Sequence, residues 1–125
     1  MAFIHKKTFN IAPMDMRNNA GFFYVDDALA IAIQALNRKG YHTYACCEGH
    51  LFSAGRQLNI VFHDSVDLPY LPDGFYFERC RLLFDYKSPN ESIFDFIREK
   101  ADVCEALTVW ACTLPANPLR EDLAE

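Results

Sequence analysis

The stretch DDALAIAIQALNRKGYHTYACC, residues 26–47, decides the fold because it predicts a helix followed directly by a strand. Apolar residues recur there at helical spacing, behind two aspartates that favour the positive end of a helix dipole. Gly40 then ends a helix that we expect over about residues 26–39. Residues 41–47 are rich in β-formers and predict a strand. The helical repeat comprises Leu29, Ala32, Ile33 and Leu36.

Further strands are predicted on both sides of this stretch. Residues 58–63 are the next β-rich run, and the segment from Glu48 to Gln57 connects this run to the strand over residues 41–47. Alternating apolar residues later in the chain predict one bent strand or two short ones. Residues 3–11 are expected to form an edge strand, and residues 14–24 a loop. The expected sheet strands lie near 42–47, 58–63, 75–78 and 80–86.

A second helix is predicted over residues 89–114. Ser88-Pro89-Asn90-Glu91 has the pattern of a capping box with proline at the first helical position. About 25 residues would reach roughly 38 Å, longer than a domain of this size is wide. We therefore expect a bend near residues 106–109 or a homodimer through this helix around Trp110. One apolar stripe comprises Ile93, Ile97, Cys104, Leu107, Ala111 and Leu114, and a second comprises Phe96, Val103 and Trp110.

Together these elements predict a two-layer α+β domain, with a mostly antiparallel sheet covered on one face by two helices. A chain of 125 residues, 51% of them hydrophobic, is long enough for one core. We expect residues 1–125 to form a single domain that ends in a polar, acidic tail over residues 116–125.

Charge and cysteine content narrow the classes of partner and compartment. The formal charge is −5 and the basic residues are scattered, so direct nucleic-acid binding is not expected. We expect no export signal, because no long apolar run follows the charged start, and no later run approaches the roughly 18 apolar residues of a membrane span. Five cysteines then indicate reduced thiols, and we expect a cytoplasmic protein.

The segment Cys46-Cys47-Glu48-Gly49-His50 concentrates reactive side chains within one turn, so we expect a ligand site there. Gly49 is free to take the positive φ that such a turn requires. Cys47 and His50 form a plausible zinc half-site, which His42, His63, Asp64 or Cys80 could help to complete. Neighbouring strand residues face opposite sides, so Cys46 and Cys47 cannot both bind one ion without a bulge.

Two other interpretations of the cysteines stay open. Cys46 or Cys47 could be a nucleophile activated by His50 or His63. Either could equally be a small buried hydrophobe, as we expect for Cys80, Cys104 and Cys112.

The position of His63 depends on how the two strands pair. A simple antiparallel hairpin splits the polar residues into two clusters, Cys47-Glu48-His50 and His42-His63, whereas a single cluster requires a parallel or crossed arrangement.

The order helix, Gly-Tyr strand, Cys-x-Gly-His turn and strand ending in His-Asp covers about residues 25–64. It resembles small proteins of unknown function from Gram-positive bacteria and their phages. More distantly, it is similar to the tRNA wybutosine-synthesising methyltransferase-like family, whose Ser-x-Cys-Ser-Gly-Arg turn falls on Cys46 to His50. That resemblance implies S-adenosylmethionine binding and methyl transfer, with Cys47, Gly49 and His63 at the family's positions. Glu48 and His50 stand where the family has Ser and Arg.

Two classes of function follow from the sequence. The first is a small ligand-binding or enzymatic domain that holds a metal ion, such as zinc, or a small nucleotide-like anion at Cys46–His50. The second is a non-enzymatic acidic protein, encoded by a phage or mobile element, that inhibits a host or defence protein by binding its surface.

Overall fold

The computed structural model describes residues 2–5, 22–25, 27–49, 56–63, 66–88 and 92–118. Along the chain its elements are β1 (Ala2–His5), β2 (Phe22–Val25), the 3-10 turn η2 (Asp27–Leu29), α1 (Ala30–Arg38), β3 (Thr43–Cys47), β4 (Gln57–Phe62), β5 (Tyr76–Glu78), β6 (Arg81–Asp85) and α2 (Ile93–Thr113).

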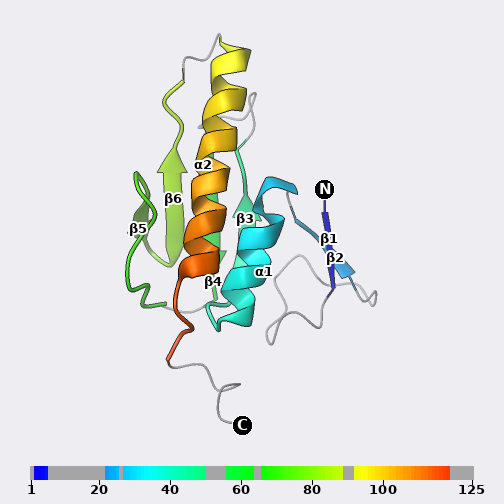
Figure 1. The fold of residues 1–125 in the computed structure, drawn as a ribbon, viewed down its shortest axis with the longest axis vertical. Coiled ribbons are helices and arrows are strands. Elements are labelled where there is room, and N and C mark those ends of the chain that lie inside the picture. The colour runs from blue at the N-terminus through cyan, green and yellow to red at the C-terminus, as the bar shows by residue number, and fades with distance from the viewer. Residues whose placement is uncertain are drawn as a thin grey trace.

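The main sheet has four antiparallel strands in the order β3-β4-β6-β5. Both helices lie on the same face of this sheet, with the long α2 running in front of β4 and beside β6 (Figure 1). This arrangement confirms the predicted two-layer α+β fold. Within the described ranges, no helix combines the length and apolar character needed to cross a membrane.

Alternation along β4 and β6 decides which face the helices cover. Leu58, Ile60 and Phe62 are buried in β4, and the register sets Leu82 opposite Ile60, so both point to the same face. Side chains of α1 and α2 complete this core. The helical residues with the least exposed surface are Leu29, Ala32, Ile33, Leu36, Phe96, Cys104, Leu107, Trp110 and Ala111.

A buried asparagine joins the end of α1 to the start of β3. Asn37 is 1% exposed; its amide donates to the Ile33 carbonyl at 2.8 Å and to the Thr43 hydroxyl at 2.9 Å. Its side-chain oxygen accepts the Thr43 N–H at 3.0 Å. Because both ends of this amide are satisfied, the residue is buried without leaving an unpaired polar group.

The same corner holds the carboxyl end of α2. The Lys39 ammonium donates to the carbonyls of Ala111 and Cys112 at 2.8 and 2.7 Å. Tyr41, whose pKa is raised by burial, donates its hydroxyl to the Pro115 carbonyl at 2.8 Å. The Lys39 ammonium thus satisfies carbonyl groups that a helix leaves without partners at this end, and Tyr41 fixes the chain just beyond the helix.

The predicted start of the last helix is wrong by one turn. Ser92 is its N-cap, with the hydroxyl accepting the Asp95 N–H at 3.4 Å, and α2 begins at Ile93. Ser88 instead accepts from the Arg56 guanidinium at 3.2 Å, while its N–H donates to the Glu99 carboxylate at 2.9 Å. The 21 residues of α2 span about 31 Å, shorter than the sequence suggested.

The apolar stripes of this helix need correction as well. Ile93 and Ile97 are half exposed, whereas Phe96 and Trp110 of the second stripe are buried against the sheet. The helical face toward the core therefore lies between the two predicted stripes, and in the first turns it includes Phe96 but neither Ile93 nor Ile97. Cys104 is buried as expected, but Cys112 is exposed, so its predicted burial is wrong.

Near the amino terminus, β1 pairs with β2 in a separate antiparallel hairpin. An early strand was predicted at β1, but the prediction of a loop through Tyr24 is wrong, since residues 22–25 form β2. Residues 6–21 lie outside the described part of the chain.

The β5–β6 hairpin turns through two residues that carry side chains in a left-handed conformation. Arg79 and Cys80 have φ angles of 52° and 64°, between the paired residues Glu78 and Arg81. Two central residues with positive φ define the tight hairpin turn that normally uses Asn-Gly. Cys80 thus belongs to the turn rather than to the strand predicted over residues 80–86.

We expect Asn37→Ala to lower the free energy of unfolding by about 2–3 kcal/mol, because it leaves the buried Thr43 N–H without its acceptor. Urea unfolding would measure this change. Gln34→Ala, on the same helix, is the control and should change stability by less than about 0.5 kcal/mol. Equal effects of the two substitutions would contradict the role given to Asn37.

Arg79→Asn should raise the free energy of unfolding by about 0.5–1 kcal/mol, because asparagine tolerates the left-handed region better than arginine. Arg79→Ala keeps the steric cost and serves as the control, with no gain expected. Thermal unfolding of the three proteins gives the comparison, and identical stabilities of the Asn and Ala variants would rule out strain at this turn.

Candidate functional site

The two adjacent cysteines at the end of β3 face opposite sides of the sheet. Cys46 lies opposite Ile60 in the register and packs against the core, whereas Cys47 lies opposite Asn59 on the other face. The irregularity of this strand falls between Thr43 and Ala45, before the cysteines. Cys46 and Cys47 therefore do not converge, and Cys46 has the packing of a small hydrophobe.

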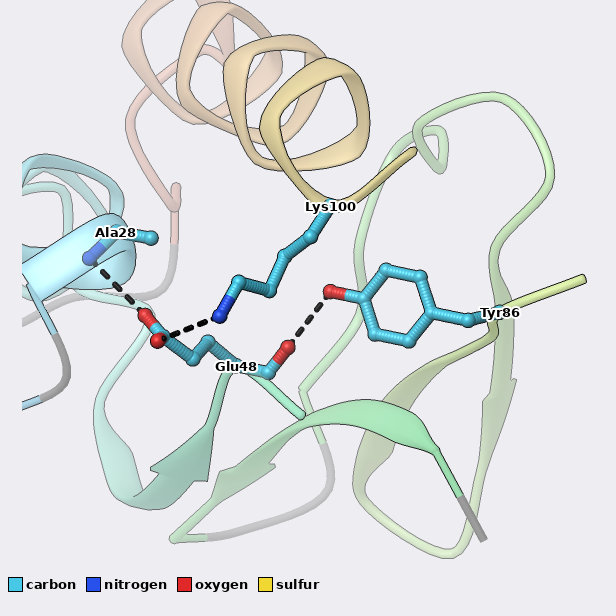
Figure 2. A network of polar contacts seen from close by, with 4 residues as sticks. All are labelled: Ala28, Glu48, Tyr86 and Lys100. Carbon is cyan, nitrogen blue, oxygen red and sulfur yellow. Dashed lines mark hydrogen bonds and ion pairs between the residues drawn. The ribbon is translucent and has the colours of Figure 1, made fainter. Parts of the chain in front are cut away.

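Glu48 makes polar contacts with three other elements of the structure (Figure 2). One carboxylate oxygen accepts the Ala28 N–H at 3.2 Å, and the other accepts from the Lys100 ammonium at 3.0 Å. The Ala28 N–H belongs to the turn that leads into α1, where backbone donors lack helical partners. Glu48 thus joins the end of β3 to the start of the first helix and to the middle of α2.

Tyr86 completes this network from the end of β6. Its hydroxyl donates to the Glu48 carbonyl at 2.6 Å (Figure 2). Its ring packs edge-on against Phe84 and Phe96, with centroids 5.4 and 5.1 Å away. Burial raises the pKa of this phenol, and the adjacent Cys104 thiol raises it further, so Tyr86 is a neutral donor.

Gly49 is required by the close approach of Tyr86. Its φ is +89°, which confirms the expectation that this turn uses a left-handed glycine. A Cβ at this position would lie 2.6 Å from Cε2 of Tyr86 and 3.3 Å from the Gln57 carbonyl oxygen. Any side chain at position 49 would therefore push the tyrosine away from the Glu48 carbonyl.

Two cations pack beside the network on the ring of Phe96. The Arg56 guanidinium lies 4.7 Å from the ring centroid and the Lys100 ammonium 5.7 Å from it. Such contacts are favourable because the ring face is electron-rich. The sequence contains no local signal for this arrangement, since Arg56 and Lys100 lie 44 positions apart.

A second carboxylate, that of Glu99, organises the chain just before α2. It accepts the N–H groups of Lys87 at 2.8 Å and of Ser88 at 2.9 Å. Burial by itself would raise the pKa of Glu99, but these backbone donors together outweigh it and lower the pKa. The segment before α2 is therefore held by the helix itself.

His42 and His63 lie together at one end of the β3–β4 hairpin, as an antiparallel pairing predicts, while His50 lies outside the described residues. β3 and β4 are antiparallel, and the His63 N–H donates to the His42 carbonyl at 3.0 Å. The His63 ring lies edge-on to Tyr44, 5.2 Å between centroids. His63 is four residues beyond Asn59, the partner of Cys47, which corresponds to about 13 Å along the strand.

His50 and Asp64 lie outside the described residues, so a zinc site that uses Cys47 and His50 stays a prediction. Among the residues that the structure describes, no three His, Cys, Asp or Glu side chains lie together as a metal site would require. The strand register sets His63 at the opposite end of the hairpin from Cys47, whose thiol is half-buried.

Comparisons with known proteins returned no matching family model, no matching curated protein and no matching solved structure. The resemblance to the wybutosine-synthesising family and to the Gram-positive and phage proteins therefore stays a prediction.

Glu48→Gln should lower the free energy of unfolding by about 1–3 kcal/mol, because an amide cannot accept from both Ala28 and Lys100 at its two ends. Chemical denaturation of Glu48→Gln, Lys100→Met and the double variant would give the coupling energy. Glu78→Gln, on the other face of the sheet, is the control for loss of one negative charge. Strictly additive effects of the two substitutions would show that the Glu48–Lys100 pair contributes nothing.

Proposed function

We propose that this protein is a non-enzymatic acidic binding protein that acts by occupying the surface of another protein, such as a host or defence protein. The observation that carries the proposal is the exposed apolar start of α2. Phe94 is 82% exposed, Ile97 55% and Ile93 50%. Clusters of exposed apolar side chains on a protein surface are typical of interaction sites.

The position of these residues on the helix supports this interpretation. Phe96 in the same turn is buried, so this turn of the helix already contributes an aromatic side chain to the core. Phe94 projects to the opposite side of α2, where it contributes nothing to that core. An aromatic side chain seated in a partner's pocket is a typical anchor of an interface, since it buries a large apolar area with few rotatable bonds.

The charge of this chain indicates the charge of the partner surface that we propose. The chain carries a formal charge of −5, and three of the four exposed charged side chains on α2 are acidic: Asp95, Asp102 and Glu105, against the basic Arg98 one turn from Phe94. Carboxylates around an apolar contact favour a basic partner surface, mainly by accelerating association.

A ligand site at Cys46–His50 is the weaker proposal. A metal ion or an anion at Glu48 would compete with Lys100 and with the Ala28 N–H for the carboxylate oxygens. Arg56, another candidate to bind an anion, is engaged with Ser88 and with the Phe96 ring. Glu48 and Arg56 thus have structural partners within the chain that need no ligand.

The proposal predicts that Phe94→Ser/Ile97→Ser loses a partner that the unchanged protein captures from an extract of its own cells. Quantitative mass spectrometry would compare the two captures, and we expect about tenfold less partner with the variant. Ile31→Ser is the matched control, because Ile31 is 63% exposed on α1.

Capture that is unaffected by Phe94→Ser/Ile97→Ser, or reduced equally by Ile31→Ser, would refute a binding surface on α2. Circular dichroism of each variant establishes that a loss of capture is not a loss of fold. Stoichiometric zinc in the purified protein, removed by Cys47→Ser, would support the ligand site in its place.

A further inference from the structure

The carboxyl half of α2 forms one wall of a groove of about 520 Å³, and the loop over residues 70–73 forms the other. The loop is fixed to the helix by two hydrogen bonds. The Trp110 indole N–H donates to the Tyr70 carbonyl at 3.0 Å, and the Tyr70 hydroxyl donates to the Thr113 carbonyl at 3.4 Å. The groove therefore exists before any partner arrives, which lowers the entropic cost of binding.

The lining of the groove is largely apolar. Val109 is 57% exposed, Tyr70 48% and Leu71 36%, while Trp110 is buried at the base. The volume lies in the range of sites that hold small ligands or a few side chains. The apolar lining thus suits an aliphatic side chain that enters from outside.

The rim of the groove carries one sign of charge. Among the described residues that line it, Asp73, Asp102 and Glu105 are acidic and none is basic. All three are exposed. An apolar side chain flanked by cations would satisfy both the base and the rim of this groove.

We infer that the groove receives a segment of the partner protein in which an apolar side chain is flanked by lysine or arginine. This inference rests on the protein-binding function proposed above and names the chemistry of the partner. A second copy of this chain is the less suitable occupant. It would bring another chain of charge −5, with the same carboxylates on α2, against the acidic rim.

Trp110 provides the readout, because it is the only tryptophan in the chain. The probe is an amphipathic peptide of leucine, alanine and lysine, and the comparison peptide has glutamate in place of every lysine. We expect the lysine peptide to shift Trp110 emission in a saturable, salt-sensitive manner. The glutamate peptide should leave the emission unchanged.

Asp102→Asn/Glu105→Gln should weaken binding of the lysine peptide by about fivefold to tenfold, because two rim charges are lost. Glu78→Gln/Asp85→Asn is the matched control. It removes the same charge from strand positions whose register faces away from the helices. Val109→Ser should also weaken binding, and Ile31→Ser should not.

Equal binding of both peptides, no binding, or equal weakening by the control pair would overturn the inference. A dimer in light scattering that Val109→Ser dissociates would assign the groove to a second copy and overturn it as well. If the peptide fails while capture still depends on Phe94 and Ile97, only the groove is misassigned. Loss of that dependence refutes the proposed function itself.

Discussion

The carboxylate of Glu48 is the interaction on which the arrangement of the helices over the sheet depends. It lies at the end of β3, yet its two oxygens accept from the start of the first helix and from the middle of α2. These contacts join three segments that are far apart in the chain. The pair with Lys100 is partly buried, so removing one partner leaves a charge that water only partly reaches.

The surroundings of Glu48 explain why the turn is so rich in polar side chains. Tyr86 reaches its carbonyl, and this contact requires glycine at the next position. Phe96 packs on Tyr86, and the charged groups of Arg56 and Lys100 lie over its ring. Glu48, part of a cluster that resembles a reactive centre in sequence, therefore connects the sheet to the two helices.

The proposed binding function rests on the outer side of α2. Its amino-terminal end displays apolar side chains that the core does not need, and its carboxyl half borders a groove with an acidic rim. Both features lie on one rigid helix, whose carboxyl end is held by Lys39. A surface of this kind suits binding by a preformed face rather than by folding of a flexible segment.

Sequence alone determined the class of fold, because the periods of apolar residues differ between helix and strand and are local properties. The helix before Gly40, the four sheet strands, the left-handed Gly49 and the burial of Cys104 all follow from neighbours in the chain. What the sequence could not determine were contacts between distant residues. Ser88 had the pattern of a cap, but the carboxylate of Glu99 and the guanidinium of Arg56 engage it, and Ser92 caps the helix.

The same limit applied to the faces of α2 and to the candidate site. Ile93 and Ile97 fit an apolar stripe by spacing, yet only the packing of the helix on the sheet decides which of its positions are covered. Glu48 was visible as a carboxylate in a turn, but its partners Lys100 and Tyr86 come from elements 52 and 38 positions away. The spacing of apolar residues is a local property, so the sequence by itself determined the helices and strands. The partner of a charged side chain depends on which elements pack against it, so only the tertiary structure decided it.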